Sequence, residues 1–152
     1  MDDIDRRIVA ELQHDARITT RALAVRVGLA ASSTAARVRD LERRGVITGF
    51  HAAVDLEAIG RPIQAMVFVK LSPTDEQTIS AFLAEVSSME ETLSVFVISG
   101  VEDAIVHVAV ADVAELRDTV VRRISAIPAV ADERTSLVFD EIRSSPGVVG
   151  PS

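Results

Sequence analysis

The sequence contains no cysteine, tryptophan, tyrosine or asparagine, and its aromatic residues are limited to five phenylalanines. Without cysteine the chain cannot form disulfides, thiolate nucleophiles or thiolate metal sites. The three histidines, His14, His51 and His107, lack the HxxxH or HxH spacing of a metal site. Glycine-rich phosphate-binding motifs and a GxSxG nucleophile motif are missing as well. We therefore expect a protein that is not an enzyme and needs no cofactor or metal.

Long apolar runs are also missing, since the stretch from Ala104 to Ala111 is one of the longest and is too short to cross a bilayer. The chain begins MDDIDRR, which is acidic and has no apolar segment, so we expect no secretory signal and a cytoplasmic protein. With 152 residues, 48% apolar and 26% charged, the composition predicts a globular chain of one ordinary domain or two small ones.

The charge is distributed unevenly along the chain. The whole chain carries a net charge of −7, which by itself argues against nucleic acid as a partner. Residues 17–50, however, hold seven arginines and only two acidic residues, for a net charge of +5, whereas residues 51–152 carry −9. A basic segment inside an acidic protein favours nucleic-acid binding by that segment.

Apolar residues at helical spacing predict two helices at the start of the chain. The first covers residues 3–14, capped by Asp2 or Asp3. The second begins near Thr19 and ends at Gly28, where a left-handed backbone is easiest without a Cβ atom. The residues expected to face inward are Ile4, Ile8, Val9, Leu12, Leu23, Ala24 and Val27.

A third helix is predicted from Ser32 to Arg44, with an inward stripe of Ala35, Val38 and Leu41. Its opposite face carries small hydroxyl residues and arginines, which is typical of the recognition helix of a helix-turn-helix DNA reader. Arg37 is long enough to reach guanine or a phosphate. The residues expected to contact DNA are Arg21, Ser32, Ser33, Thr34, Ala36, Arg37, Arg39, Arg43 and Arg44, the last three through phosphates. An arginine-rich helix face can also be merely solvated, or belong to a protein-docking module.

The remaining sequence alternates between strand and helix patterns. Helices are expected from Thr74 to Met89 and from Asp112 onward, with Thr74…Gln77 and Asp112…Glu115 as capping boxes. Strands are expected at residues 46–54, 63–71, 93–99, 104–110 and 130–139. After the first strand the order is βαββαβ, which predicts an α+β chain whose C-terminal domain is a ferredoxin-like sandwich. The expected divisions are a helix-turn-helix domain 1–50, a linker 51–60, a ferredoxin-like domain 61–143 and a flexible tail 144–152.

In such a sandwich both helices cover one face of the sheet, and the strands here are too apolar for the other face to be in water. A second copy of the sheet is the expected cover, which predicts a dimer or a larger assembly. RNA-binding domains share this topology, but they stack bases on aromatic residues of both the first and the third strand. Residues 104–110 contain no aromatic residue, so we do not expect RNA binding by the sheet.

These residues resemble the Lrp/AsnC (feast/famine, leucine-responsive regulatory protein) family of transcriptional regulators over about residues 2–143. The similar segments are IDRRIVAELQHDARIT (4–19), LAVRVGLAASSTAARVRDLERRGVITGF (23–50), Ser99-Gly100 with Asp103, and RTSLV (134–138). The resemblance implies a sequence-specific DNA-binding regulator, associated with the nucleoid, whose dimers assemble further, often to octamers. It also implies that the strand 46–54 helps to pair two subunits.

The resemblance further implies that the C-terminal domain binds an amino acid or a related metabolite between dimers. The residues at the corresponding positions are Ser99, Gly100, Val101, Glu102, Asp103, Arg134 and Thr135. There Asp103 can hold an α-ammonium, and the amides near Gly100 and the Thr135 hydroxyl can hold a carboxylate. The alternative is that residues 100–103 form only a hairpin turn.

The chain departs from the family pattern at two points. In the turn, the family's G-D-x-D-Y is replaced by Gly-Val-Glu-Asp-Ala, without a tyrosine. Before the third helix, Ala30 stands where the family has a capping serine, so Ser32 or Ser33 is expected to cap the helix instead.

Two other functions remain open from the residues. One is an architectural protein that wraps DNA with little sequence preference and has no effector. The other is a small-molecule-binding ferredoxin-like domain whose helical module docks to something other than DNA. Acylphosphatase-type catalysis on this topology is set aside, because it relies on an asparagine and the chain has none.

Overall fold

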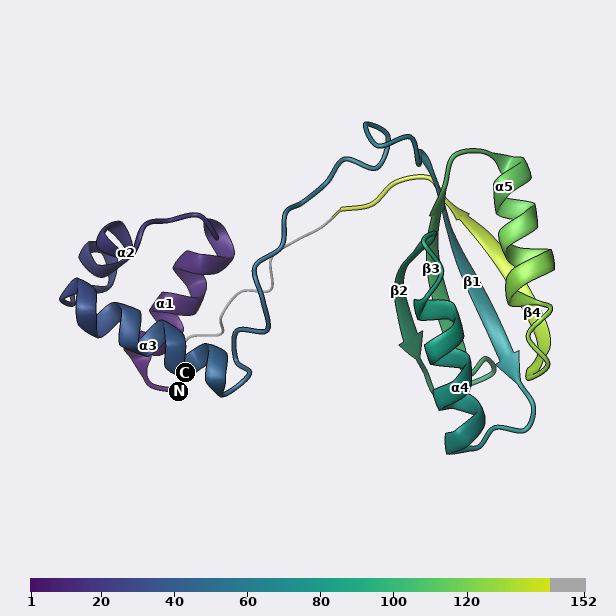
Figure 1. The fold of residues 1–152 in the computed structure, drawn as a ribbon, viewed down its shortest axis with the longest axis horizontal. Coiled ribbons are helices and arrows are strands. Elements are labelled where there is room, and N and C mark those ends of the chain that lie inside the picture. Colours follow the sequence, from purple (N-terminus) through teal and green to yellow (C-terminus); the bar gives the residue numbers. More distant parts are fainter. Residues whose placement is uncertain (143–152) are drawn as a thin grey trace. The chain divides into compact units, whose positions relative to one another are not determined.

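The computed structural model describes residues 1–142, which form two compact units, residues 1–53 and 54–141 (Figure 1). The first unit contains the three predicted helices, α1 (Asp3–His14), α2 (Thr20–Val27) and α3 (Ala31–Arg43). Their core is built from Ile8, Leu23, Val27 and Leu41, each at most 2% exposed. The helical periodicity of the sequence therefore predicted both the helices and most of the residues that hold them together.

The start of α1 is closed by a reciprocal pair of hydrogen bonds. The Asp2 carboxylate accepts from the backbone N–H of Asp5 at 2.8 Å, and the Asp5 carboxylate accepts from the N–H of Asp2 at 3.3 Å. This capping box satisfies donors that the first turn of a helix leaves without partners. Gly28 ends α2 with a left-handed backbone, φ +75°, as predicted.

The predicted cap of the third helix is wrong. The helix begins at Ala31, Ala30 is its N-cap without any side-chain hydrogen bond, and Ser32 and Ser33 lie inside its first turn. A capping side chain contributes only about 1 kcal/mol, so the packing of the preceding turn decides where the helix starts. That turn is fixed by the N–H of Leu29, which donates to the Ala24 carbonyl at 3.0 Å while Leu29 packs on the helical core.

The second unit is a four-stranded antiparallel sheet with strand order β2-β3-β1-β4. Its elements are β1 (Ile63–Leu71), α4 (Glu76–Ser87), β2 (Thr92–Val97), β3 (Ala104–Val110), α5 (Val113–Arg117), the π-helical turn η1 (Asp118–Ile124) and β4 (Val130–Val138). This is the predicted ferredoxin-like βαββαβ order, and the chain as a whole is α+β (Figure 1).

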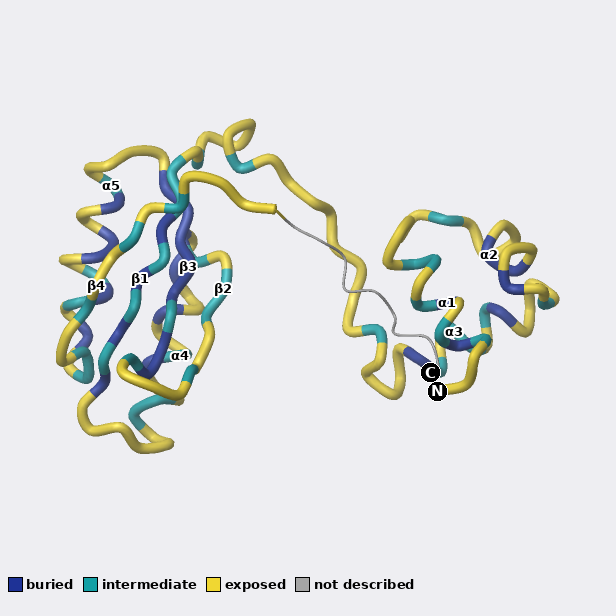
Figure 2. The backbone as a smooth tube through the Cα atoms, turned by 180° about the vertical axis from the view of Figure 1, so that it is seen from behind, coloured by how far each residue is buried: buried dark blue, intermediate teal, exposed yellow. Residues whose placement is uncertain are grey.

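Both helical segments, α4 and the pair α5–η1, pack on the same face of this sheet. Alternate residues of β1, such as Val67 and Val69, are fully buried against Phe82 of α4 and Ile124 of η1. Figure 2 shows this burial as dark bands along β1 and β3. On the opposite face β1 presents Phe68 and its alternate neighbours, which are only partly buried, because no element of this chain within residues 1–142 is packed there.

Two connecting segments differ from the sequence prediction. Residues 46–54 form no strand in the single chain, because a strand requires a hydrogen-bonded neighbour and none is present among the described residues. Asp75, not Thr74, caps α4 by accepting from the N–H of Thr78 at 2.8 Å, while the Thr74 hydroxyl donates to the Leu71 carbonyl. The predicted tail, residues 144–152, lies outside the described residues.

The predicted cap of the last helix is confirmed in part. The Asp112 carboxylate accepts from the N–H of Glu115 at 2.8 Å, but the Glu115 carboxylate accepts from Ala111 instead of returning to Asp112. Among residues 1–142, no helix is long and apolar enough to cross a membrane.

Candidate functional site

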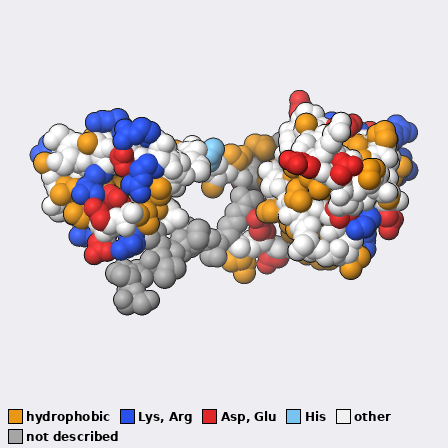
Figure 3. Space-filling model, turned by 90° about the horizontal axis from the view of Figure 1, so that it is seen from below, with side chains coloured by type: hydrophobic (Ala, Val, Ile, Leu, Met, Phe, Trp, Pro, Cys, Tyr) orange, Lys and Arg blue, Asp and Glu red, His pale blue; other side chains and the backbone are white. Residues whose placement is uncertain are grey.

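The first candidate site is the outward face of α3. Small side chains (Ser32, Ser33 and Ala36) are exposed on the N-terminal half of this helix, and the long cations Arg39 and Arg43 are exposed on its C-terminal half. Small residues let a helix approach a groove closely, and arginines further along can reach phosphates. Arg21 is exposed on the neighbouring helix α2. In Figure 3 arginine side chains gather on the visible face of the helical unit, with acidic side chains between them.

Thr34 is not on this face, which corrects the sequence prediction. Its side chain is 0% exposed, and its hydroxyl donates to the Ala30 carbonyl at 3.1 Å. In a helix, residue 34 lies one turn before Val38 and two turns before the buried Leu41, so it belongs to the inward stripe. The inward stripe predicted from Ala35 is thus displaced by one residue at the start of α3.

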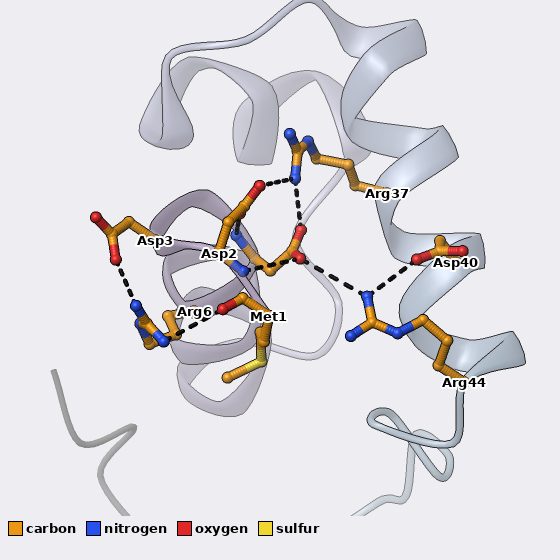
Figure 4. Close-up of polar contacts among 8 residues, drawn as sticks. Met1, Asp2, Asp3, Arg6, Arg37, Asp40 and Arg44 are labelled. Carbon is orange, nitrogen blue, oxygen red and sulfur yellow. Dashed lines mark hydrogen bonds and ion pairs between the residues drawn. The ribbon is translucent and has the colours of Figure 1, made fainter. Parts of the chain in front are cut away.

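Arg37 and Arg44 point from α3 toward the start of α1 (Figure 4). One nitrogen of Arg37, Nη1, lies 2.7 Å from both Asp2 Oδ2 and Asp5 Oδ1. Arg44 Nη1 lies 3.1 Å from Asp40 Oδ2 and 3.9 Å from Asp5 Oδ2. Both arginines were predicted from the sequence to contact DNA, and in the structure both have carboxylate partners within the protein.

The pKa values follow these contacts. The pKa of Asp2 is lowered, first by the N–H of Asp5 and then by the guanidinium of Arg37. The pKa of Arg37 is raised by the Asp2 carboxylate first and by Asp5 second. The pKa of Asp40 is lowered mainly by Arg44. Asp2, Arg37 and Asp40 are therefore charged near neutral pH, and each forms an ion pair within the same unit.

The second candidate site is a hollow of about 150 Å³ at the edge of the sheet, on the face away from the helices. The Arg134 guanidinium stacks over the Phe68 ring at 4.2 Å and donates to Glu102 Oε1 at 3.1 Å. Lys70 and Val101 line the same hollow, together with Asp132 and Glu133 of β4. A cation over an aromatic face, beside a carboxylate, is an arrangement that can bind a small polar ligand.

The structure does not bring all the predicted effector residues into this hollow. Asp103 is 9% exposed, its Oδ2 accepts from the N–H of Leu71 at 2.9 Å, and Lys70 Nζ lies 3.1 Å from it. The N–H of Leu71 is the first cause of its lowered pKa, and Lys70 adds to it. Thr135 follows Arg134 on a strand and pairs with the buried Val67, so it lies on the other side of the sheet from the hollow, where it is exposed on the edge strand β4.

Ser99 and Gly100 belong to the loop between β2 and β3 and are absent from the lining of the hollow. Val101 and Glu102 of the same loop do line it, so the predicted set is brought together only in part. Phe68 and Lys70 were not predicted. Strand alternation could have identified them, because the register pairs Phe68 with Arg134 and Lys70 with Asp132 on one face.

The described geometry can be compared with known proteins. Residues 1–48 match a winged helix-turn-helix DNA-binding family, and residues 64–148 match the Lrp/AsnC ligand binding domain. The HTH-type transcriptional regulator AldR of Mycolicibacterium smegmatis is 41% identical over 145 residues, which cover 95% of this chain and 85% of that protein. The leucine-responsive regulatory protein of Rhizobium meliloti is 32% identical over 145 residues, 95% of this chain and 93% of that one.

Solved structures agree with these relatives. The crystal structure of the transcriptional regulator NMB0573 in complex with L-Met, from Neisseria meningitidis, has a TM-score of 0.87 at 26% identity and covers 97% of this chain and 95% of that one. Because the ligand-binding family covers more than half of the chain and the relatives extend over nearly all of it, the chain belongs to the Lrp/AsnC family and is a DNA-binding transcriptional regulator with a small-molecule-binding domain, not an enzyme.

Proposed function

We propose that the protein regulates transcription at specific DNA sites on the nucleoid and that its DNA binding is altered by an amino acid held at the hollow beside Arg134. The observation that carries the proposal is the pairing of opposite charges at that hollow. Arg134 and Lys70 can donate to the carboxylate of a zwitterion, and Glu102 can accept from its ammonium. The L-Met complex of the Neisseria regulator supports an amino acid as the ligand class.

For DNA, we propose that Ser32, Ser33 and Ala36 face the base edges while Arg21, Arg39 and Arg43 contact phosphates. These residues are exposed, and the three small ones permit close approach of α3 to a major groove. A dimer would then bind half-sites separated by about 10 base pairs or a multiple of that spacing.

We propose that a second copy of the chain covers the open face of the sheet, and that dimers assemble further, to an octamer. Phe96 is 51% exposed at the edge of this face, and its register partner Ile105 is partly buried beside it. Apolar side chains in such a patch favour association with a matching surface.

The test is a calorimetric titration of the full-length protein with each of the twenty amino acids, repeated with Arg134→Met. We expect one or a few amino acids to bind the wild type and to change its affinity for the DNA upstream of its own gene. The variant should lose both effects, because it removes the guanidinium that faces Glu102. Val113→Ala, a change on the exposed surface of α5, is the matched control and should retain both. Binding that persists in Arg134→Met would contradict the proposed site.

A further inference from the structure

The start of α1 and the middle of α3 are joined by a compact group of charges. Asp5 contributes its two carboxylate oxygens to different arginines, Oδ1 to Arg37 of α3 at 2.7 Å and Oδ2 to Arg44, the C-cap of α3, at 3.9 Å. Arg37 and Arg44 are seven residues apart, which is two helical turns, so both lie on the same side of α3. Asp5 therefore meets α3 at two points along its axis.

The Asp5 carboxylate contacts three polar groups, namely Arg37, Arg44 and the N–H of Asp2. Its side chain is only 10% exposed, and it also accepts from the N–H of Asp2 in the capping box of α1. Asp2 in turn contacts Arg37 at 2.7 Å. Withdrawing Arg37 toward DNA would leave a largely buried carboxylate without its nearest cation, which is unfavourable. The contact thus favours keeping Arg37 on α1 while α3 lies against a partner.

We propose that Arg37 is a positioning residue for DNA recognition and acts through Asp5 instead of contacting bases. The Asp2–Asp5–Arg37 contact fixes the rotation of α3 about its own axis relative to α1. That rotation determines whether Ser32, Ser33 and Ala36 face the groove. Asp5, which lies on a different helix from the proposed reading residues, is by the same argument a determinant of sequence specificity.

This inference rests on the proposed sequence-specific function, and the experiment separates the two. The affinities of the full-length wild type, Arg37→Gln, Asp5→Asn and the double variant are measured for the upstream DNA and for a shuffled sequence, over a range of salt. Asp3→Asn and Arg39→Gln are the matched controls. Asp3 is a 74% exposed acid of the same helix that pairs with Arg6. Arg39 is an exposed cation of the same helix as Arg37.

The positioning role predicts that Arg37→Gln and Asp5→Asn reduce the preference for upstream DNA by the same factor, within about twofold, and that the double variant is no worse than either. It also predicts an unchanged salt slope for Arg37→Gln, since no phosphate contact is lost. Arg39→Gln should instead lower the magnitude of the slope by about 0.9. Asp3→Asn should leave the preference for upstream DNA unchanged.

Three results would contradict the positioning role of Arg37. If Asp5→Asn leaves the preference intact while Arg37→Gln abolishes it, Arg37 reads a base directly. If Arg37→Gln weakens binding to both DNAs equally and lowers the salt slope, Arg37 contacts a phosphate. If the wild type itself binds both DNAs equally, the proposed sequence-specific function fails, and the positioning role fails with it.

Asp2→Asn replaces Asp5→Asn in this test should the Asp5 variant not fold. The Asp2 side chain is 53% exposed and makes only one of the two carboxylate contacts with Arg37. The Asp2→Asn variant should also reduce the preference for upstream DNA.

Discussion

Replacing Asp103 by alanine separates a structural role for this residue from a role in effector binding. The register of β1 with β4 shifts between Lys70 and Leu71, so the N–H of Leu71 leaves the regular ladder at this point. Asp103 Oδ2 accepts from that N–H at 2.9 Å, while the backbone N–H of Asp103 donates to the Val69 carbonyl at 2.9 Å. The residue therefore fastens the loop before β3 to the end of β1.

The expected loss of stability in Asp103→Ala follows from these contacts. A hydrogen bond to a charged acceptor contributes about 1.5–3 kcal/mol, and alanine would leave the Leu71 N–H buried without an acceptor. The contact with Lys70 adds at most about 1 kcal/mol, because the lysine side chain is 44% exposed and the attraction is screened. We expect Asp103→Ala to destabilise the C-terminal unit by about 1.5–4 kcal/mol, equivalent to a fall in Tm of at least roughly 6 °C for a domain of this size.

Differential scanning calorimetry of the full-length protein is the assay, since the chain has no tryptophan or tyrosine to report unfolding by fluorescence. Asp132→Ala is the matched control, because it removes an exposed carboxylate that lines the same hollow and should change stability by no more than about 0.5 kcal/mol. An Asp103→Ala protein that unfolds at the wild-type temperature but no longer responds to its amino acid would refute this reasoning and restore Asp103 to the effector site.

Three further predictions concern α3 and acid stability. Thr34→Val should destabilise the helical unit by about 1 kcal/mol through loss of the bond to the Ala30 carbonyl, measured by calorimetry, and unchanged stability would place that hydroxyl elsewhere. The same variant should bind DNA as tightly as the wild type below its unfolding temperature, because its side chain is buried. Arg39→Gln combined with Arg43→Gln should lower the magnitude of the salt slope of DNA binding by about 1.8, and an unchanged slope would remove both from the phosphate contacts. The lowered pKa values of Asp2 and Asp103 stabilise the folded state above the ordinary aspartate pKa of about 3.9. That contribution should be lost as the pH falls below about 4 toward the folded-state values, and acid titration followed by circular dichroism measures it.

The helical unit was largely predictable because its core depends on local periodicity. Ile8, Leu23, Val27 and Leu41 all lie where a spacing of three or four residues placed them. The partner of Arg37 was not predictable in the same way, since Asp2 is 35 residues away and only the packing of α1 on α3 brings the two together. Counting charges along the sequence indicated a basic segment at residues 17–50. In the structure, Asp2 and Asp5 at the start of the chain lie beside Arg37 of that segment.

The sheet was predictable as a topology but not in its irregularities. The order of strands and helices follows from alternation and capping residues, whereas the widening of the last helix into η1 has no local signature in the sequence. Alternation along β4 could have separated Thr135 from Arg134 on sequence grounds alone, because adjacent residues of a strand face opposite sides. Residues 46–54 have no hydrogen-bonded neighbour among the described residues, so the apolar pattern there did not yield a strand.

The central claim is that the exposed face of α3 reads a DNA sequence. The most direct test compares the affinity of the full-length protein for the DNA upstream of its own gene with its affinity for a shuffled version of the same DNA, at one fixed salt concentration. The account predicts a ratio on the order of 10³ or more in favour of the upstream DNA. A ratio near one would contradict it and would favour a protein that wraps DNA with little regard to sequence.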